Sequence, residues 1–268
     1  MNIEMSSSYK FSFKDLPNCP LYHEIINGTK TVEGRKNSEQ YHNLKVDDHI
    51  LLDCKGKGIL VCRITYINKY NNIKDFLDNE SVKNALPCVN TIQDGIKIYN
   101  QYVSNDEISK LKDKYGYGFL GIGIKFEYEM KRYDIHVSEP WFSYIVSGQK
   151  TAEGRLNKSV FAQFKPKDIL NIFNKQLQQN FEFQITEIHK YDTFKEMITD
   201  LGIENVLPGI SSVEDGVNIY RQWYDEKAEN EFGVLAIKII PYFMVGGYKQ
   251  KYMKYKLKYL KLKSNYQY

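Results

Sequence analysis

The strongest constraint on the fold of this chain is an octet that occurs twice. Residues 28–35 read GTKTVEGR and residues 148–155 read GQKTAEGR, so both copies keep a Gly-x-Lys-Thr-x-Glu-Gly-Arg pattern. Other segments recur at nearly the same spacing: ITYINKY answers ITEIHKY, and LPCVNTIQDGIKIYNQYV answers LPGISSVEDGVNIYRQWY. A period near 120 residues is too long for a solenoid repeat and has the size of a domain. The sequence therefore predicts two copies of one domain.

Each copy shows the same order of expected elements. Alternating segments at residues 10–13 and 134–137 predict an opening strand. A short helix is expected to begin near Pro20 and Pro140, because proline suits a first helical position, and Gly148 is expected to end the second of them. The segment HILLDCKGKGILVCRITYI places a Gly-Lys-Gly turn between two apolar runs, which predicts a hairpin.

A pair of helices is expected toward the end of each copy. Ser211 and Glu214 have the spacing of a capping box, and Thr91 and Asp94 have that spacing in the first copy. Apolar residues then recur every three or four positions, which predicts amphipathic helices that pack in the core. These stripes are Ile92, Ile96, Tyr99 and Val103, and Val213, Val217, Tyr220 and Tyr224. A final apolar strand completes a small α+β domain, which we interpret as a partly closed barrel.

The predicted domains occupy residues 1–130 and 131–242, and a basic tail follows at residues 243–268. From position 241 onward there are seven lysines and no acidic residue, which leaves 30 basic and 33 acidic residues before it. The tyrosines of the tail are spaced by three and four, so the tail is expected to be a basic helix that needs a partner, or a disordered segment. Its candidate partners are nucleic acid, an anionic membrane surface or a partner helix.

Zinc-binding and membrane-spanning roles find no support in the sequence. The four cysteines, Cys19, Cys54, Cys62 and Cys88, form no C-x-x-C pair and no cluster with zinc spacing, and we interpret them as reduced thiols. No metal and no cofactor is predicted. The first residues lack the apolar core of a signal peptide, and no stretch has the length of a membrane span. A cytoplasmic location is therefore expected.

The segments PWF, SGQKTAEGRL, KPKDIL, SVEDGVNIYRQWY and GVLAIKI occur in the order of an ASCH domain, and the chain resembles that family. An ASCH domain is a PUA-like β-barrel with a G-x-K-x-x-E-x-R motif. The resemblance extends once per copy to about residue 241, and the second copy fits better because it has Trp141 where the first has Leu21. It implies an α+β protein with two small PUA-like barrels and flanking helices. The tail resembles Lys- and Tyr-rich tails on giant DNA virus proteins, which would imply the host cytoplasm.

The resemblance implies two kinds of role. Some ASCH proteins are nucleic-acid-binding modules of RNA-related proteins, and some small ones are amidohydrolases that deacylate acetylated cytidine. For this chain it implies binding of RNA, a nucleoside or a nucleotide through a pocket in each domain. The alternatives are an amidohydrolase acting on N-acylated cytidine and a non-catalytic adaptor recruited through the basic tail.

The octet supplies the candidate site residues. If residues 151–155 are extended, Thr151, Glu153 and Arg155 share one face, with Lys150 at the preceding turn. Arginine suits a phosphate or a base edge, and glutamate accepts from an exocyclic amine. The predicted ligand-binding residues are Lys30, Thr31, Glu33, Arg35, Lys150, Thr151, Glu153, Arg155 and Trp141.

Two further interpretations of the octet stay open. For an enzyme the catalytic candidates are Lys150, Glu153 and Thr151, with Lys150 activating water, because some hydrolases of this family have threonine where this chain has Glu33 and Glu153. Without a function, Glu153 and Arg155 would simply pair on an exposed strand, which is worth under about 1 kcal/mol. Retention of the same residues in both copies favours a shared site or an obligatory turn.

Overall fold

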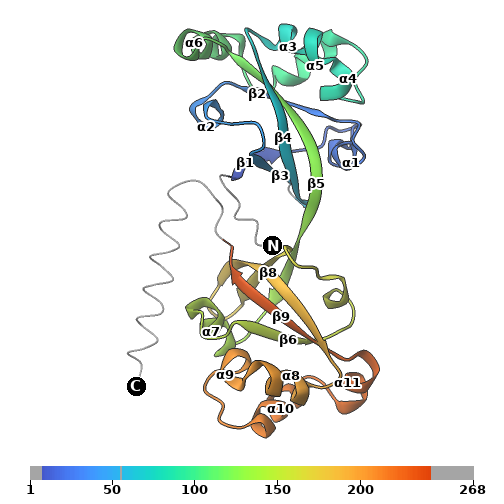
Figure 1. Ribbon diagram of the computed structural model, residues 1–268, viewed down its shortest axis with the longest axis vertical. Helices are drawn as coiled ribbons and strands as arrows, with labels where there is room; N and C mark the ends of the chain where they lie inside the picture. The colour runs from blue at the N-terminus through green and yellow to red at the C-terminus, as the bar shows by residue number, and fades with distance from the viewer. Residues whose placement is uncertain (1–7, 55, 243–268) are drawn as a thin grey trace. The chain divides into compact units, whose positions relative to one another are not determined.

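The computed structural model describes residues 8–54 and 56–242. The chain divides into two compact units, Met1–Met130 and Lys131–Tyr268 (Figure 1). Both units have the same sequence of strands and helices, each with its own apolar core. The predicted fold class, α+β with two similar domains and flanking helices, is confirmed. The predicted tail lies outside the described residues.

The first unit is built on a strand-rich sheet. Its strands are β1 (Ser8–Phe13), β2 (Val32–Lys36), β3 (His49–Cys54), β4 (Gly58–Tyr70) and the first part of β5 (Phe119–His136). Their order is β1-β3-β4-β5-β2, so β1 and β2 lie at its two ends. β1 and β3 are parallel, whereas β3 and β4 form the predicted antiparallel hairpin. Side chains of both end strands, β1 and β2, line the cavity described below.

Helices flank this sheet. They are α1 (Leu21–Ile26), α2 (Glu39–His42), α3 (Ile73–Glu80), α4 (Val82–Ala85), α5 (Ile92–Tyr99) and α6 (Asn105–Tyr115). Figure 1 shows α3, α4 and α5 gathered at one end of the strands. Phe76 and Leu77 of α3 are fully buried, which fixes this helical layer on the sheet. α5 thereby holds its last residue, Tyr99, against β2.

The second unit repeats this arrangement. Its strands are the end of β5, β6 (Ala152–Leu156), β7 (Ile169–Asn174), β8 (Gln179–Tyr191) and β9 (Val234–Pro241), in the order β5-β7-β8-β9-β6. Its helices are α7 (Trp141–Ser147), α8 (Phe194–Leu201), α9 (Ile203–Val206), α10 (Val213–Arg221) and α11 (Glu226–Phe232), with a 3₁₀ turn at Phe161–Gln163. The end of β5 pairs in parallel with β7, as β1 does with β3. β5 and β6 are therefore the end strands here.

One strand serves both units. The sequence predicts a closing strand for the first copy and a separate opening strand for the second, but β5 runs through both positions without a break over 18 residues. Its first residues pair with β2, and residues 132–136 pair with β7. The repeat boundary thus falls inside a strand, where no turn residue marks it.

The helix ends confirm most of the predicted signals. Gly148 follows α7 in the left-handed region with φ 80°, as a C-terminal glycine should. The Thr91 side chain accepts from the backbone N–H of Asp94 and begins α5 as predicted. The predicted capping pair of α10 is wrong by one residue, because Ser212 accepts from the N–H of Asp215. This shift restores the register of the repeat, in which Ser212 corresponds to Thr91.

The cysteines differ from the prediction. Cys19 and Cys88 form a disulfide with their Cα atoms 5.5 Å apart, so the interpretation of all four as reduced thiols is wrong. The bond joins the segment before α1 to the segment after α4. Cys54 and Cys62 are buried free thiols. Within residues 8–54 and 56–242, no helix is long and apolar enough to cross a membrane, and no cluster of His, Cys, Asp and Glu could hold a metal ion.

Candidate functional site

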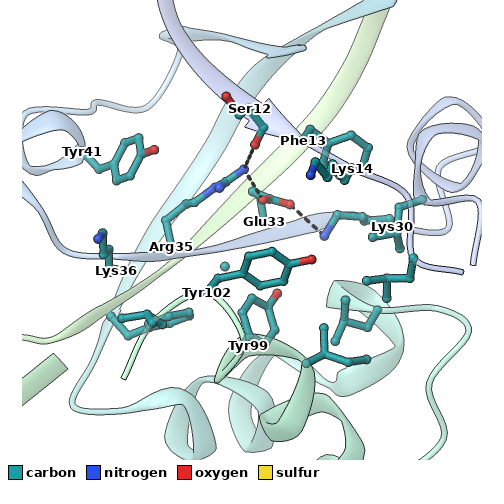
Figure 2. A pocket seen from close by; sticks show the side chains of 17 residues that line it. Ser12, Phe13, Lys14, Lys30, Glu33, Arg35, Lys36, Tyr41, Tyr99 and Tyr102 are labelled. Carbon is teal, nitrogen blue, oxygen red and sulfur yellow. Dashed lines mark hydrogen bonds and ion pairs between the residues drawn. The ribbon is translucent and has the colours of Figure 1, made fainter. Parts of the chain in front are cut away.

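The charged residues of the first octet form one buried network (Figure 2). Glu33 lies between two cations, with Oε2 2.9 Å from the Lys30 ammonium and Oε1 2.8 Å from the Arg35 guanidinium. Lys30 also donates to the backbone oxygen of Ala85 at 2.6 Å, and Arg35 donates to that of Ser12 at 3.1 Å. One glutamate thus organises contacts to α4 on one side and to β1 on the other.

The second octet builds the same network. Glu153 lies 3.1 Å from the Lys150 ammonium and 2.9 Å from the Arg155 guanidinium. Lys150 donates to the backbone oxygen of Val206, and Arg155 donates to that of His136 at 3.1 Å. The two octets therefore occupy equivalent places in their units.

This network has a structural role. Arg35 extends from β2 to the backbone of β1, and Arg155 extends from β6 to the end of β5. These strands are the ends of each sheet, so arginine joins them where no backbone pairing does. Lys30 and Lys150 are only 2% and 3% exposed. Glu33 and Glu153 are each 6% exposed, so the alternative of an exposed Glu–Arg surface pair is wrong. The network joins the two ends of each sheet.

Burial and neighbouring charges set the ionisation of the network. Burial alone would raise the pKa of Glu33 and Glu153, but the adjacent lysine and arginine outweigh it and hold both pKa values below the ordinary range. Both carboxylates are therefore ionised acceptors. In the second unit, burial lowers the pKa of Lys150 despite the carboxylate of Glu153, and the nearby Arg155 adds to this.

A cavity of about 420 Å³ opens beside the first network. Figure 2 shows Glu33 and Arg35 facing it together with Tyr99 and Tyr102. Tyr102 is 62% exposed, so its ring lies at the rim, whereas Tyr99 lies over the backbone of β2. The other lining residues come from several elements: Ser12, Phe13, Lys14, Leu16, Leu21, Lys30, Gly34, Lys36, Tyr41, Leu86, Ile98, Val103 and Phe119.

A cavity of about 450 Å³ occupies the equivalent place in the second unit. Tyr220 corresponds to Tyr99, and Trp223, which is 56% exposed, corresponds to Tyr102. Its lining contains Asp134, Ile135, His136, Val137, Ser138, Trp141, Lys150, Glu153, Gly154, Arg155, Phe161, Leu207, Ile219, Tyr220, Trp223 and Tyr224. We call the two cavities the first and second pockets.

The second glycine of each octet is required by close packing. A Cβ atom at Gly34 would lie 2.7 Å from the hydroxyl oxygen of Tyr99, and one at Gly154 would meet the hydroxyl of Tyr220. Burial raises the pKa of both tyrosines, and the nearby carboxylate adds to this, so both keep their proton. Because glycine has no side chain, the neutral phenol of the tyrosine can pack on the strand at the pocket floor, beside the glutamate.

The sequence profile of the ASCH domain matches residues 19–117 and 135–243, which together span most of the chain. The chain belongs to the ASCH domain family. The two ASCH domains correspond to the two structural units, and their fold is PUA-like, as the resemblance implied. No protein with a curated description matches this sequence.

Two solved structures are similar to single ASCH domains of this chain. Hypothetical protein PH0355 is 40% identical with a TM-score of 0.39, and the match covers 41% of this chain and 99% of that one. Protein PF0455 from Pyrococcus furiosus is 32% identical with a TM-score of 0.36, and the match covers 42% of this chain and 99% of that one.

The ASCH pockets bring together most of the predicted site residues. The lining includes Lys30, Glu33, Arg35, Lys150, Glu153, Arg155 and Trp141. Thr31 and Thr151 are exposed and do not line either pocket, and the Thr151 hydroxyl lies against Asn205 instead. The assumption that Thr151 shares the face of Glu153 is wrong, because Thr151 is exposed whereas Glu153 is buried and lines the second pocket.

Sequence reasoning missed the aromatic side of the pockets. The sequence places Tyr99 and Tyr220 in apolar stripes of the core, and it indicates no role for Tyr102 and Trp223. Their signal was present in the repeat, because IYNQYV and IYRQWY keep an aromatic residue at both positions. Trp223 corresponds to Tyr102 in that alignment, and both are large exposed aromatics at a pocket rim.

Proposed function

We propose that each ASCH domain of this protein binds a base of RNA, or a modified nucleoside, in its pocket. The observation that carries the proposal is an exposed aromatic ring at the rim of a cavity whose floor holds an ionised carboxylate. Tyr102 and Glu33 form this pair in the first pocket, and Trp223 and Glu153 form it in the second.

The chemistry of a base suits this arrangement. A base has a flat π-face that stacks on aromatic rings, and an edge with amine donors and carbonyl acceptors. Glu33 and Glu153 can accept from an exocyclic amine, while the partly exposed Arg35 and Arg155 can donate to a carbonyl or a phosphate. The apolar residues of the lining strengthen such hydrogen bonds, which would then select one edge over another.

The rim aromatics give the sharpest test, because their exposure makes them dispensable for folding. We expect the double variant Tyr102→Ala and Trp223→Ala to bind single-stranded RNA about 5- to 150-fold more weakly for each lost stack, from about 1–3 kcal/mol per base. Affinity would be measured by fluorescence anisotropy with labelled mixed-sequence RNA at fixed salt.

A matched control separates stacking from general surface effects. Tyr117 and Leu177 are 42% and 44% exposed and line neither pocket. The variant carrying Tyr117→Ala and Leu177→Ala should bind RNA like the wild type. Equal affinity of the rim variant and this control would count against base binding in the pockets.

One observation favours a second function, the deacylation of an N-acylated cytidine in the second pocket. The pKa of Lys150 is lowered by burial, which is the direction that a lysine acting as a base requires. In this reaction the neutral amine of Lys150 would take a proton from water, and the hydroxide oxygen would attack the acyl carbon. The acyl C–N bond would then break as Lys150 returns its proton to N4, which releases cytidine and the carboxylic acid. Thr151 has no part in it, since its side chain lies outside the pocket.

The two functions are separable by product analysis. Incubation with N4-acetylcytidine should release acetate and cytidine if the second function holds, and Lys150→Met should abolish the release. Tight binding without any product would leave base binding as the function of the second pocket. The adaptor role through the tail concerns residues outside those that the structure describes.

A further inference from the structure

The two pockets share their floor but differ in charge. The first pocket is lined by four cations, Lys14, Lys30, Arg35 and Lys36, against the single carboxylate of Glu33. Lys36 pairs with Glu107 beyond the lining, whereas Lys14 makes no ion pair with any residue that the structure describes. The first pocket therefore has a net positive lining even after its internal pairs are counted.

The second pocket has no such excess. Its two cations, Lys150 and Arg155, face two carboxylates, Glu153 and Asp134. Arg35 bonds to Ser12 as Arg155 bonds to His136, so the residue that corresponds to Lys14 is two positions after His136, namely Ser138. The free ammonium of the first pocket is thus replaced by a hydroxyl.

Both linings hold five Phe, Tyr or Trp residues, but the two tryptophans lie only in the second lining. Where the first pocket has Leu21, Tyr41, Tyr102 and Val103, the second has Trp141, Phe161, Trp223 and Tyr224. The larger π-surface of tryptophan favours an uncharged flat ligand, whereas the ammonium of Lys14 favours a phosphate. The second lining also includes the carboxylate of Asp134, which would repel a phosphate.

We propose that the two pockets divide the ligand between them: the first takes a nucleotide through its phosphate, and the second takes an uncharged nucleoside or base. The inference rests on the proposed function and adds the ligand class of each pocket. The two domains would then recognise different chemical groups of their ligands, a phosphate in the first pocket and a base in the second.

The placement of tryptophan makes this division measurable. The protein has two tryptophans, Trp141 and Trp223, and both line the second pocket. Tryptophan emission therefore reports on the second pocket alone, while calorimetry reports on both. The probes are the four ribonucleosides and their 5′-monophosphates, each titrated into the full-length protein.

We expect a nucleoside to quench tryptophan emission with an affinity at least about tenfold higher than that of its monophosphate. Calorimetry should show a further monophosphate site that leaves the emission unchanged, which we call the silent site. Lys14→Ser should lower the monophosphate affinity of the silent site about tenfold. Lys74→Ser removes an exposed lysine of α3 outside the lining and should leave this affinity unchanged.

Misfolding could also explain a loss of affinity in Lys14→Ser, so a second variant is designed to gain affinity instead. Ser138→Lys gives the second pocket the ammonium of the first, and it should raise the monophosphate affinity seen by tryptophan emission about tenfold. Equal quenching affinities for nucleoside and monophosphate, or an unchanged silent site in Lys14→Ser, would overturn the division. If RNA still bound through the rim aromatics, the proposed function would stand, whereas no binding of any probe or of RNA would overturn both.

Discussion

At the scale of single residues, the glutamate of each octet has two roles, and the spacing of the octet alone does not predict both. Glu33 and Glu153 hold the two ends of each sheet together through their cation partners, and they also form a pocket floor. Because the carboxylate is nearly buried, a change there leaves two cations without a counter-charge. The test of a binding role must therefore be kept apart from the test of stability.

The first prediction concerns that stability. Glu153→Gln should lower the free energy of unfolding by about 3–5 kcal/mol, since it breaks a buried pair from one side. Chemical denaturation would measure it. Glu187→Gln is the matched control, because Glu187 pairs with Lys238 and His189 on the surface and should cost under about 1 kcal/mol. Similar losses for both variants would contradict the structural role of the network.

The second prediction follows from the lowered pKa of Glu153. The unfolded chain binds this proton near the ordinary value of 4.5, whereas the folded protein binds it only at lower pH. The stabilisation is therefore complete above about pH 4.5 and is lost as the pH falls through the folded pKa. The stability gap between wild type and Glu153→Gln should narrow in denaturation series below pH 4.5, and a constant gap would contradict it.

The third prediction uses the glycine of the second octet. Gly154→Ala should destabilise the protein and close the pocket floor, because its Cβ meets the Tyr220 hydroxyl and lies 2.8 Å from Cε of Met197. Removing the hydroxyl should relieve part of this strain, so Gly154→Ala with Tyr220→Phe should unfold at a higher temperature than Gly154→Ala alone. No recovery in the double variant would show that the hydroxyl of Tyr220 is not the main obstacle.

At the scale of elements, the helix caps show how far the sequence could be used. Thr91 and Asp94 were identified correctly, but SSVEDG offers two serines, each with an acidic residue three positions later. Only packing decides between them, because α10 must place Tyr220 over Gly154. The unbroken β5 was unpredictable for a similar reason, since no glycine or proline marks the end of the first copy.

The fourth prediction tests the cap of α10. Ser212→Ala should cost about 1 kcal/mol of stability, because the N–H of Asp215 loses its acceptor. Ser211→Ala should leave the unfolding midpoint within error of the wild type. A larger loss of thermal stability in Ser211→Ala than in Ser212→Ala would instead support Ser211 as the cap, as the sequence indicated.

At the scale of the whole molecule, the repeat predicted two equivalent pockets but not their difference. The octets are nearly identical, so they place the same floor in both units. The residues that make one lining more cationic than the other, such as Lys14 against Ser138, lie outside the octet on segments with little similarity. Their shared position becomes visible only when the fold brings β1 and the end of β5 to the same place in each unit.

The last prediction concerns how charge is distributed along the chain. Residues before position 241 carry 30 basic and 33 acidic side chains, whereas the segment from 241 onward carries seven lysines and no acid. Nonspecific affinity for nucleic acid should therefore depend on that segment, and selectivity on the pockets. Deleting residues 246–268 should remove most of the salt dependence of RNA binding, which amounts to a slope of about −0.7 in log affinity per phosphate contact on a single strand.

Titrations at several salt concentrations would compare the full chain, the truncated chain and the Trp223→Ala variant. Trp223→Ala should lower affinity while leaving the slope unchanged, because stacking releases no counterions. An unchanged slope after truncation would place the phosphate contacts on the ASCH domains themselves. The first pocket, with Lys14 at its edge, would then be the surface to test next, since its lining holds the cations that the second lacks.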